Sequence, residues 1–92
     1  MSYSYPIDEQ YWSKEEIIDV VNFYSMIEEA YEKGVSRDDL MLAYTRFKQI
    51  VPSKSEEKKL TSQFEKESGY SSYRTIKEAK KAHPGERIKM NL

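Results

Sequence analysis

The chain has 92 residues, of which 38% are hydrophobic and 34% charged, and its formal net charge is −1. A chain of this length has room for one core, so we expect residues 1–92 to form a single helical domain. The sequence contains no cysteine and one histidine, which excludes disulfides, thiolate metal sites and histidine-rich metal clusters. The near-zero net charge also removes the simplest argument for a nucleic-acid or membrane-surface protein.

Charge is distributed unevenly along the chain. Residues 1–33 contain eight acidic and two basic residues, a net charge of −6, whereas residues 74–92 contain six basic and two acidic residues, a net charge of +4. The first ten residues form neither a basic region nor an apolar run, and the longest apolar stretch is only Leu40 to Tyr44. We therefore expect a soluble, cytoplasmic protein without a membrane span.

The first predicted helix runs from about Lys14 to Lys33. Ser13 and Glu16 have the spacing of a capping box at its start, and Gly34 provides a left-handed stop at its end. Its apolar residues recur at helical spacing and form one stripe: Ile17, Val20, Val21, Phe23, Tyr24, Ile27, Ala30 and Tyr31. We expect this helix to be the central scaffold of the fold.

A second helix is predicted from Ser36 to Pro52. Ser36 is a favourable N-cap, and Asp38 and Asp39 place negative charge at the positive end of the helix dipole. The apolar stripe of this helix is Leu40, Ala43, Tyr44, Phe47, Ile50 and Val51. We expect the stripe to pack against the first helix.

A third helix is predicted over residues 54–68. Ser53 begins another capping-box pattern, and Gly69 closes the helix. Leu60 and Phe64 are its one apolar pair at helical spacing. We therefore expect this helix to lie on the surface of the first two and to bury little area.

A fourth helix is predicted over residues 73–82, with Ser71 or Ser72 as its N-cap and a His-Pro-Gly sequence after it. Tyr73 and Ile76 are expected to anchor it to the core. The elements together predict an all-α fold, a small compact bundle of about four helices within residues 13–82.

The two ends of the chain differ in character. Residues 1–12 contain five large apolar or aromatic residues around Pro6, so we expect an extended aromatic arm that packs across the helices: Tyr3, Tyr5, Ile7, Tyr11 and Trp12. In the tail, residues 83–92, apolar and polar residues alternate from Ile88 onward. That alternation is typical of a docked strand, but so short a run leaves a free tail equally open.

Glu28 is predicted to point inward, because helical spacing places it on the apolar stripe between Tyr24 and Tyr31. One interpretation is an acid with a raised pKa, or a ligand for a divalent ion. The other is a structural carboxylate that a tyrosine hydroxyl or a basic side chain satisfies. We favour the structural interpretation.

Two pairs of carboxylates on the first helix, Glu16 with Asp19 and Glu29 with Glu32, raise the hypothesis of a magnesium-dependent enzyme. Such an enzyme would use Glu28, Glu29 and Glu32. We disfavour this hypothesis, because the helical angles point the paired side chains in different directions and the sequence has no glycine-rich phosphate loop. With one histidine and no cysteine, no nucleophile and base pair can be assembled either. We therefore assign no catalytic residue, expect no metal or cofactor, and favour a protein that is not an enzyme.

Four apolar residues lie off the predicted stripes and form the candidate protein-contact surface: Ile18, Met26, Met41 and Leu42. Apolar side chains outside the core face indicate contact with another protein or with a second copy of the chain. The basic residues of the last helix suggest an alternative, a nucleic-acid contact: Arg74, Lys77, Lys80 and Lys81. The details of a helix-turn-helix motif fit poorly there, and a solvated basic helix explains the same charges.

The chain also resembles a known family. The resemblance rests on short motifs in a fixed order, which include Trp12-Ser13, Ala30 to Gly34, Ile50 to Lys54 and Ser68 to Ser71. In these the sequence is similar to the uncharacterised protein family numbered 0223, small proteins of low-GC Gram-positive bacteria. The resemblance covers about residues 3–80 and implies a compact all-helical fold, with no assigned activity, cofactor or catalytic residue.

The sequence thus predicts a small, non-enzymatic, cytoplasmic module for protein interaction or regulation, which works by binding another protein or itself. The alternative is an accessory protein that associates with nucleic acid through its basic final helix. No membrane partner is expected.

Overall fold

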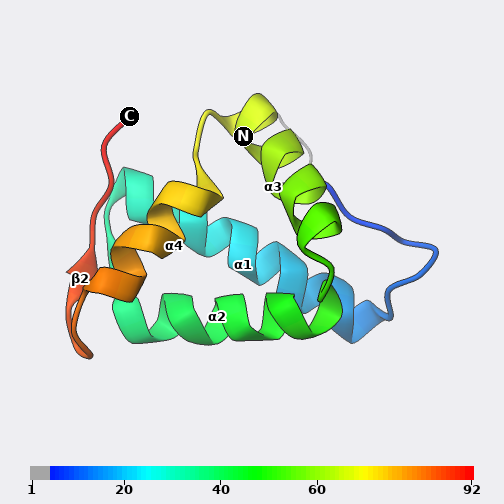
Figure 1. Cartoon of the computed structure of the whole chain (residues 1–92), viewed down its shortest axis with the longest axis horizontal. Helices are drawn as coiled ribbons and strands as arrows, with labels where there is room; N and C mark the ends of the chain where they lie inside the picture. Colours follow the sequence, from blue (N-terminus) through cyan, green and yellow to red (C-terminus); the bar gives the residue numbers. More distant parts are fainter. Residues whose placement is uncertain (1–4) are drawn as a thin grey trace.

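In the computed structural model, which describes residues 5–92, the chain forms a bundle of helices with one short two-stranded sheet (Figure 1). The elements in chain order are α1 (Lys14–Glu32), β1 (Val35–Ser36), α2 (Arg37–Ile50), α3 (Lys54–Ser68), α4 (Ser72–Lys81) and β2 (Arg87–Ile88). The predicted all-α class is confirmed, and the boundaries of the helices lie within one or two residues of those predicted.

Each helix begins at a serine cap. The Ser13 hydroxyl accepts a hydrogen bond from the Glu16 amide at 3.2 Å, and the Glu16 carboxylate accepts one from the Ser13 amide at 2.8 Å, which completes the predicted capping box. Ser53 caps α3 with the forward bond alone: its hydroxyl accepts from the Glu56 amide, and the structure records no return bond from the Glu56 side chain within residues 5–92. Ser71 is the N-cap of α4.

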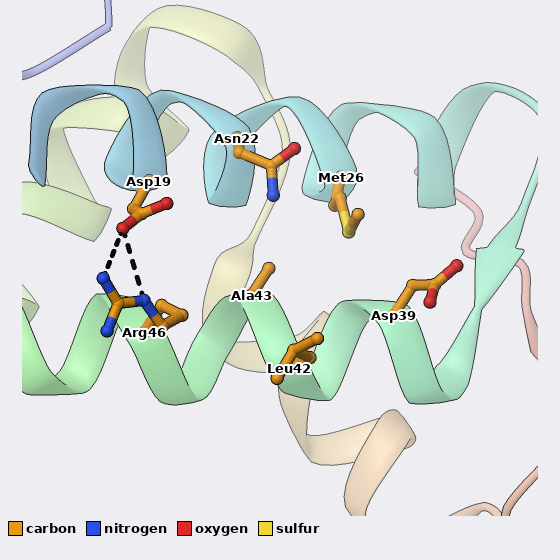
Figure 2. Close-up of a pocket in the computed structure, with 7 residues that line it drawn as sticks. All are labelled: Asp19, Asn22, Met26, Asp39, Leu42, Ala43 and Arg46. Carbon is orange, nitrogen blue, oxygen red and sulfur yellow. Dashed lines mark hydrogen bonds and ion pairs between the residues drawn. The ribbon is translucent and has the colours of Figure 1, made fainter. Parts of the chain in front are cut away.

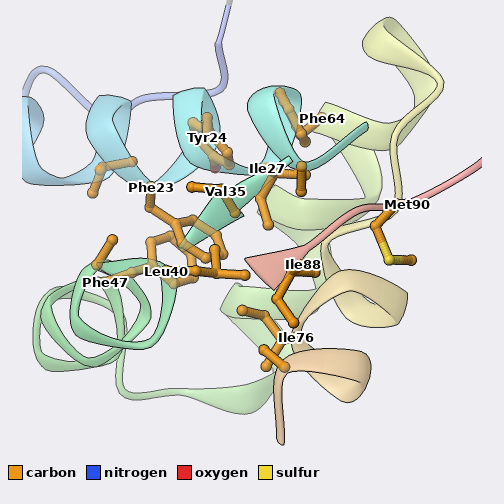
Figure 3. Packing of buried hydrophobic residues seen from close by; sticks show 14 of the residues in the cluster. Phe23, Tyr24, Ile27, Val35, Leu40, Phe47, Phe64, Ile76, Ile88 and Met90 are labelled. Atoms are coloured by element: carbon orange, nitrogen blue, oxygen red, sulfur yellow. The ribbon is translucent and has the colours of Figure 1, made fainter. Parts of the chain in front are cut away.

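The core lies between α1 and α2 and is closed by α3, α4 and the tail (Figure 3). Phe23 of α1 stacks on Phe47 of α2 with ring centroids 4.6 Å apart, and Tyr24 stacks on Phe64 of α3 at 4.7 Å. The stripe of α1 faces inward as predicted, although three of its members are only half-buried at the margins: Ile17, Val21 and Tyr31. Phe64 is the buried residue of α3, so that helix is a surface helix as expected.

The prediction that Tyr73 anchors α4 is wrong, since Tyr73 is 73% exposed. The helix begins at Ser72, and its buried face is formed by Ser72, Thr75, Ile76 and Ala79. Tyr73 follows Ser72 by one residue and is therefore rotated by about 100° away from that face.

The N-terminal segment is extended for a shorter distance than expected. Tyr5 packs its ring against Tyr24 and Phe64, at centroid distances of 5.5 Å and 6.0 Å. From Asp8 the chain turns instead of remaining extended, because the Asp8 carboxylate accepts hydrogen bonds from two following amides. The turn leaves Tyr11 exposed, which corrects the prediction that it packs, and Tyr3 lies outside the described residues.

The C-terminal tail is docked as a strand. β2 pairs antiparallel with β1, with Val35 opposite Ile88, and the Met90 amide donates to the Ala30 carbonyl at 2.8 Å. The last turn of α1 contains no basic residue, and the tail supplies donors there: Lys89 to the Glu32 carbonyl and Arg87 to the Gly34 carbonyl. The tail therefore satisfies carbonyls at the end of α1 that the helix leaves unpaired.

We predict that Ile88→Ala lowers the free energy of unfolding by about 2–4 kcal/mol, because it removes a buried side chain that joins the tail to the core. Leu92→Ala is the matched control: Leu92 is 87% exposed, and its removal is expected to change stability by less than about 0.5 kcal/mol. Urea denaturation measures both values. Equal effects of the two substitutions would show that the tail is not docked.

Candidate functional site

A groove with a volume of about 210 Å³ runs along the outer side of the contact between α1 and α2 (Figure 2). Residues at helical spacing on the two helices line it: Asp19, Asn22, Met26, Asp39, Leu42, Ala43 and Arg46. Apart from Ala43, which belongs to the α2 stripe, these positions lie beside the core stripes, so the inward packing of the stripes places them along the two edges of the groove. The groove has a mixed apolar and charged lining.

Opposite charges lie at the two ends of the α2 edge. At one end the Arg46 guanidinium donates two hydrogen bonds to the same Asp19 oxygen, from Nη2 at 2.7 Å and from Nε at 3.3 Å. At the other end the Asp39 carboxylate has no ion-pair partner among residues 5–92. Between them Leu42 is 64% exposed (Figure 2). The edge therefore presents an acid, an exposed leucine and an arginine in that order.

The structure divides the predicted protein-contact surface. Met26 and Leu42 both line the groove, Met26 from α1 and Leu42 from α2. Ile18 is 60% exposed on α1 but does not line the groove. Met41 is half-buried against the core, because it is rotated by about 100° from Leu42 on the same helix. Sequence spacing alone did not identify Asp39 and Arg46 as neighbours of the exposed leucine.

Glu28 points inward and is 8% exposed. The Tyr5 hydroxyl donates a hydrogen bond to its Oε1 atom at 2.7 Å, whereas its Oε2 atom is buried without a hydrogen-bond partner among the described residues. Burial raises the pKa of the Glu28 carboxyl, and the negative charge of Glu32 raises it further. Tyr5 thus satisfies one oxygen of the carboxylate, as the structural interpretation expects, and leaves the second oxygen unpaired among the described residues.

Four other carboxylates of α1 are each engaged separately. Glu29 lies 3.8 Å from the Lys33 ammonium, and Glu32 accepts a hydrogen bond from the Tyr70 hydroxyl at 3.0 Å. Glu16 belongs to the capping box, and Asp19 to the groove. Within residues 5–92, no three acidic or histidine side chains are grouped so as to hold a metal ion.

The basic residues of α4 do not form one cluster. Arg74, Lys77 and Lys81 line a hollow of about 350 Å³ between α4 and the tail. Lys80 lies elsewhere, with its ammonium 5.7 Å from the centroid of the Tyr44 ring. The structure adds Lys89 to the lining of the hollow, a residue that the sequence analysis did not select. The alternation of apolar and polar residues from Ile88 onward was the signal in the sequence that the tail, and Lys89 with it, could dock.

No helix in the described part of the chain is long and apolar enough to cross a membrane.

The comparisons with known proteins all give the same family. Residues 2–88 match the model of the family described as "Uncharacterised protein family (UPF0223)". A UPF0223 protein of Oceanobacillus iheyensis is 64% identical over 83 residues, which cover 90% of this chain and 93% of the relative. The UPF0223 protein YktA of Bacillus subtilis is 52% identical over 82 residues, which cover 89% of this chain and 92% of the relative.

The raised pKa of Glu28 predicts a specific pH dependence. The folded protein binds this proton more readily than the unfolded chain, in which the ordinary value is 4.5, so the ionised carboxylate destabilises the fold as pH rises through the folded pKa. Glu28→Gln removes the charge. We therefore expect the stability of this variant relative to the parent to increase between about pH 4.5 and about pH 7.

Urea denaturation across this pH range measures that difference. Glu29→Gln is the control, since it changes the neighbouring carboxylate on the same helix, which lies at the surface beside Lys33. The interpretation of Glu28 is contradicted if its relative stability stays constant or decreases as the pH rises.

Proposed function

The chain belongs to the uncharacterised protein family UPF0223. We propose that it is a cytoplasmic, non-enzymatic interaction module that pairs with a second copy of itself through the groove between α1 and α2. The observation that supports this proposal is the order of Asp39, Leu42 and Arg46 along the α2 edge of the groove.

Exposure supports a contact on this side of the molecule. The core already occupies the inward faces of α1 and α2, so the exposed Leu42 at the groove contributes nothing to it. Met26 extends the apolar surface from the α1 side of the groove. Apolar side chains grouped beside a groove and surrounded by polar residues are typical of a protein interface.

Charge favours a second copy as the partner. Asp39 precedes Leu42 by three residues and Arg46 follows it by four, so all three lie on one side of α2 (Figure 2). When two α2 helices pack antiparallel about a two-fold axis at Leu42, each leucine meets its copy and each Asp39 faces the Arg46 of the other copy. A second copy therefore supplies both complementary charges, whereas an unrelated partner needs its own matching pair.

The composition of the surface indicates a weak contact. Its apolar centre is small, and the rim is made of charged and amide side chains such as Asp19, Asn22 and Arg46. Interfaces of this kind are typical of transient association, in contrast to the larger apolar surfaces of permanent dimers. We expect a dissociation constant on the order of micromolar, at which dimer and monomer exchange with concentration.

We predict that Leu42→Lys prevents pairing, because it places two positive charges together at the two-fold axis and removes the apolar contact. Leu92→Lys is the matched control, since it makes the same change at an exposed leucine on the tail. Sedimentation velocity from about 5 µM to about 500 µM distinguishes monomer from dimer.

The parent protein and the Leu92 variant are expected to shift toward the dimer as concentration rises, whereas the Leu42 variant stays monomeric. A parent protein that remains monomeric throughout this range contradicts the proposal. So does a Leu42 variant that dimerises as the parent does.

A further inference from the structure

A second hollow, separate from the groove, lies between α4 and the C-terminal tail. It has a volume of about 350 Å³ and shares no lining residue with the groove. Its lining is mainly basic and polar: Tyr73, Arg74, Lys77, Glu78, Lys81, Lys89, Met90 and Asn91. The proposed pairing of α2 helices makes no use of this part of the molecule.

Tail docking forms the hollow. The buried face of α4 includes Thr75, Ile76 and Ala79, so its basic residues are left on the outward side. The hydrogen bond from the Met90 amide to the Ala30 carbonyl holds the tail beside α4. Lys89 and Asn91 thereby complete the wall opposite the helix.

The hollow has an excess of positive charge. Four of its lining residues are basic, and Glu78 is acidic, at 3.5 Å from the Lys81 ammonium. The Lys89 ammonium donates to the Glu32 carbonyl at 3.2 Å, whereas Arg74 and Lys77 have no ion-pair partner in the described part of the chain. Positive charge concentrated at a concave surface attracts anionic ligands, even on a protein with a net charge of −1.

An exposed aromatic ring distinguishes between anionic ligands. Tyr73 is 73% exposed beside these cations and packs into no part of the core. A nucleotide offers both groups that the hollow is suited to bind, a phosphate for the cations and a flat base for the ring. An acidic peptide offers only the charge.

We propose that this hollow binds single-stranded nucleic acid, with a base stacked on Tyr73 and phosphates held by Arg74, Lys77 and Lys81. A single strand is favoured over a duplex because a duplex hides the faces of its bases, which the exposed ring needs for stacking. The volume is also that of a site for one small ligand, at the low end of the range for pockets in proteins. The proposal does not depend on self-association.

Fluorescence anisotropy with end-labelled oligouridine and oligothymidine of roughly 12 nucleotides tests the proposal. At about 50 mM salt we expect saturable binding of at least one of the two strands, and their relative affinities report whether the sugar is recognised. Three cations in contact with phosphates predict that log K falls against log salt with a slope of about −2.

Two pairs of variants isolate the contacts. Lys77→Gln is expected to weaken binding several-fold at low salt and to make the slope less steep by about 0.7. Lys80→Gln is its control, because it removes the same charge from the same helix at a residue that lies over Tyr44. Tyr73→Ala is expected to weaken binding by at least about five-fold. Tyr11→Ala is its control at another exposed tyrosine.

Four results would overturn the proposal. They are an absence of binding at low salt, equal losses from the Lys77 and Lys80 variants, an unchanged affinity after Tyr73→Ala, and competition by polyglutamate as effective as that by unlabelled oligonucleotide. The third would show that no base stacks on Tyr73, and the last would identify a site for acidic protein segments in place of nucleic acid. All four substituted side chains are exposed, so circular dichroism is expected to show the parent fold in each variant.

Discussion

Aromatic packing joins α1 to α2 and sets the rotation of both helices about their axes. The Phe23 and Phe47 rings stack at 4.6 Å, and Tyr24 continues the cluster to Phe64 of α3. This packing fixes which side of each helix faces inward. The remaining sides of α1 and α2 then form a groove whose lining residues lie outside the core, apart from Ala43, which is buried in it, and Met26, which packs against it.

Local signals in the sequence predicted most of the fold. Serine caps such as Ser13 and Ser71 act within the first turn of a helix, so they are readable without knowledge of tertiary contacts. Contacts between distant residues were not readable in this way. The pairing of Val35 with Ile88 joins strands of two residues, too short to leave a clear pattern. Tyr73 was misplaced because it precedes Ile76 by three residues, a spacing that favours one helix face, whereas the buried face of α4 includes Ser72 in its place.

The candidate sites were predicted only in part, for the same physical reason. Sequence spacing identifies the residues that lie outside an apolar stripe, but it does not show which of them a neighbouring helix covers. Met41 and Leu42 both lie off the α2 stripe, yet one is half-buried and the other borders the groove. Similarly, Lys80 lies over the Tyr44 ring, while Lys89 reaches the hollow through the docked tail.

Exchange of charges across the α2 edge gives the sharpest test of self-pairing. Asp39→Arg and Arg46→Asp each place like charges opposite one another in a symmetric pair, so each variant alone is expected to remain monomeric. When the two variants are mixed, the residues at positions 39 and 46 again face opposite charges across the pair, although Arg46→Asp also removes the ion pair with Asp19 within its own chain. We expect sedimentation velocity to detect a dimer in the mixture and in neither variant alone. A mixture that stays monomeric, at concentrations where the parent protein dimerises, would contradict it.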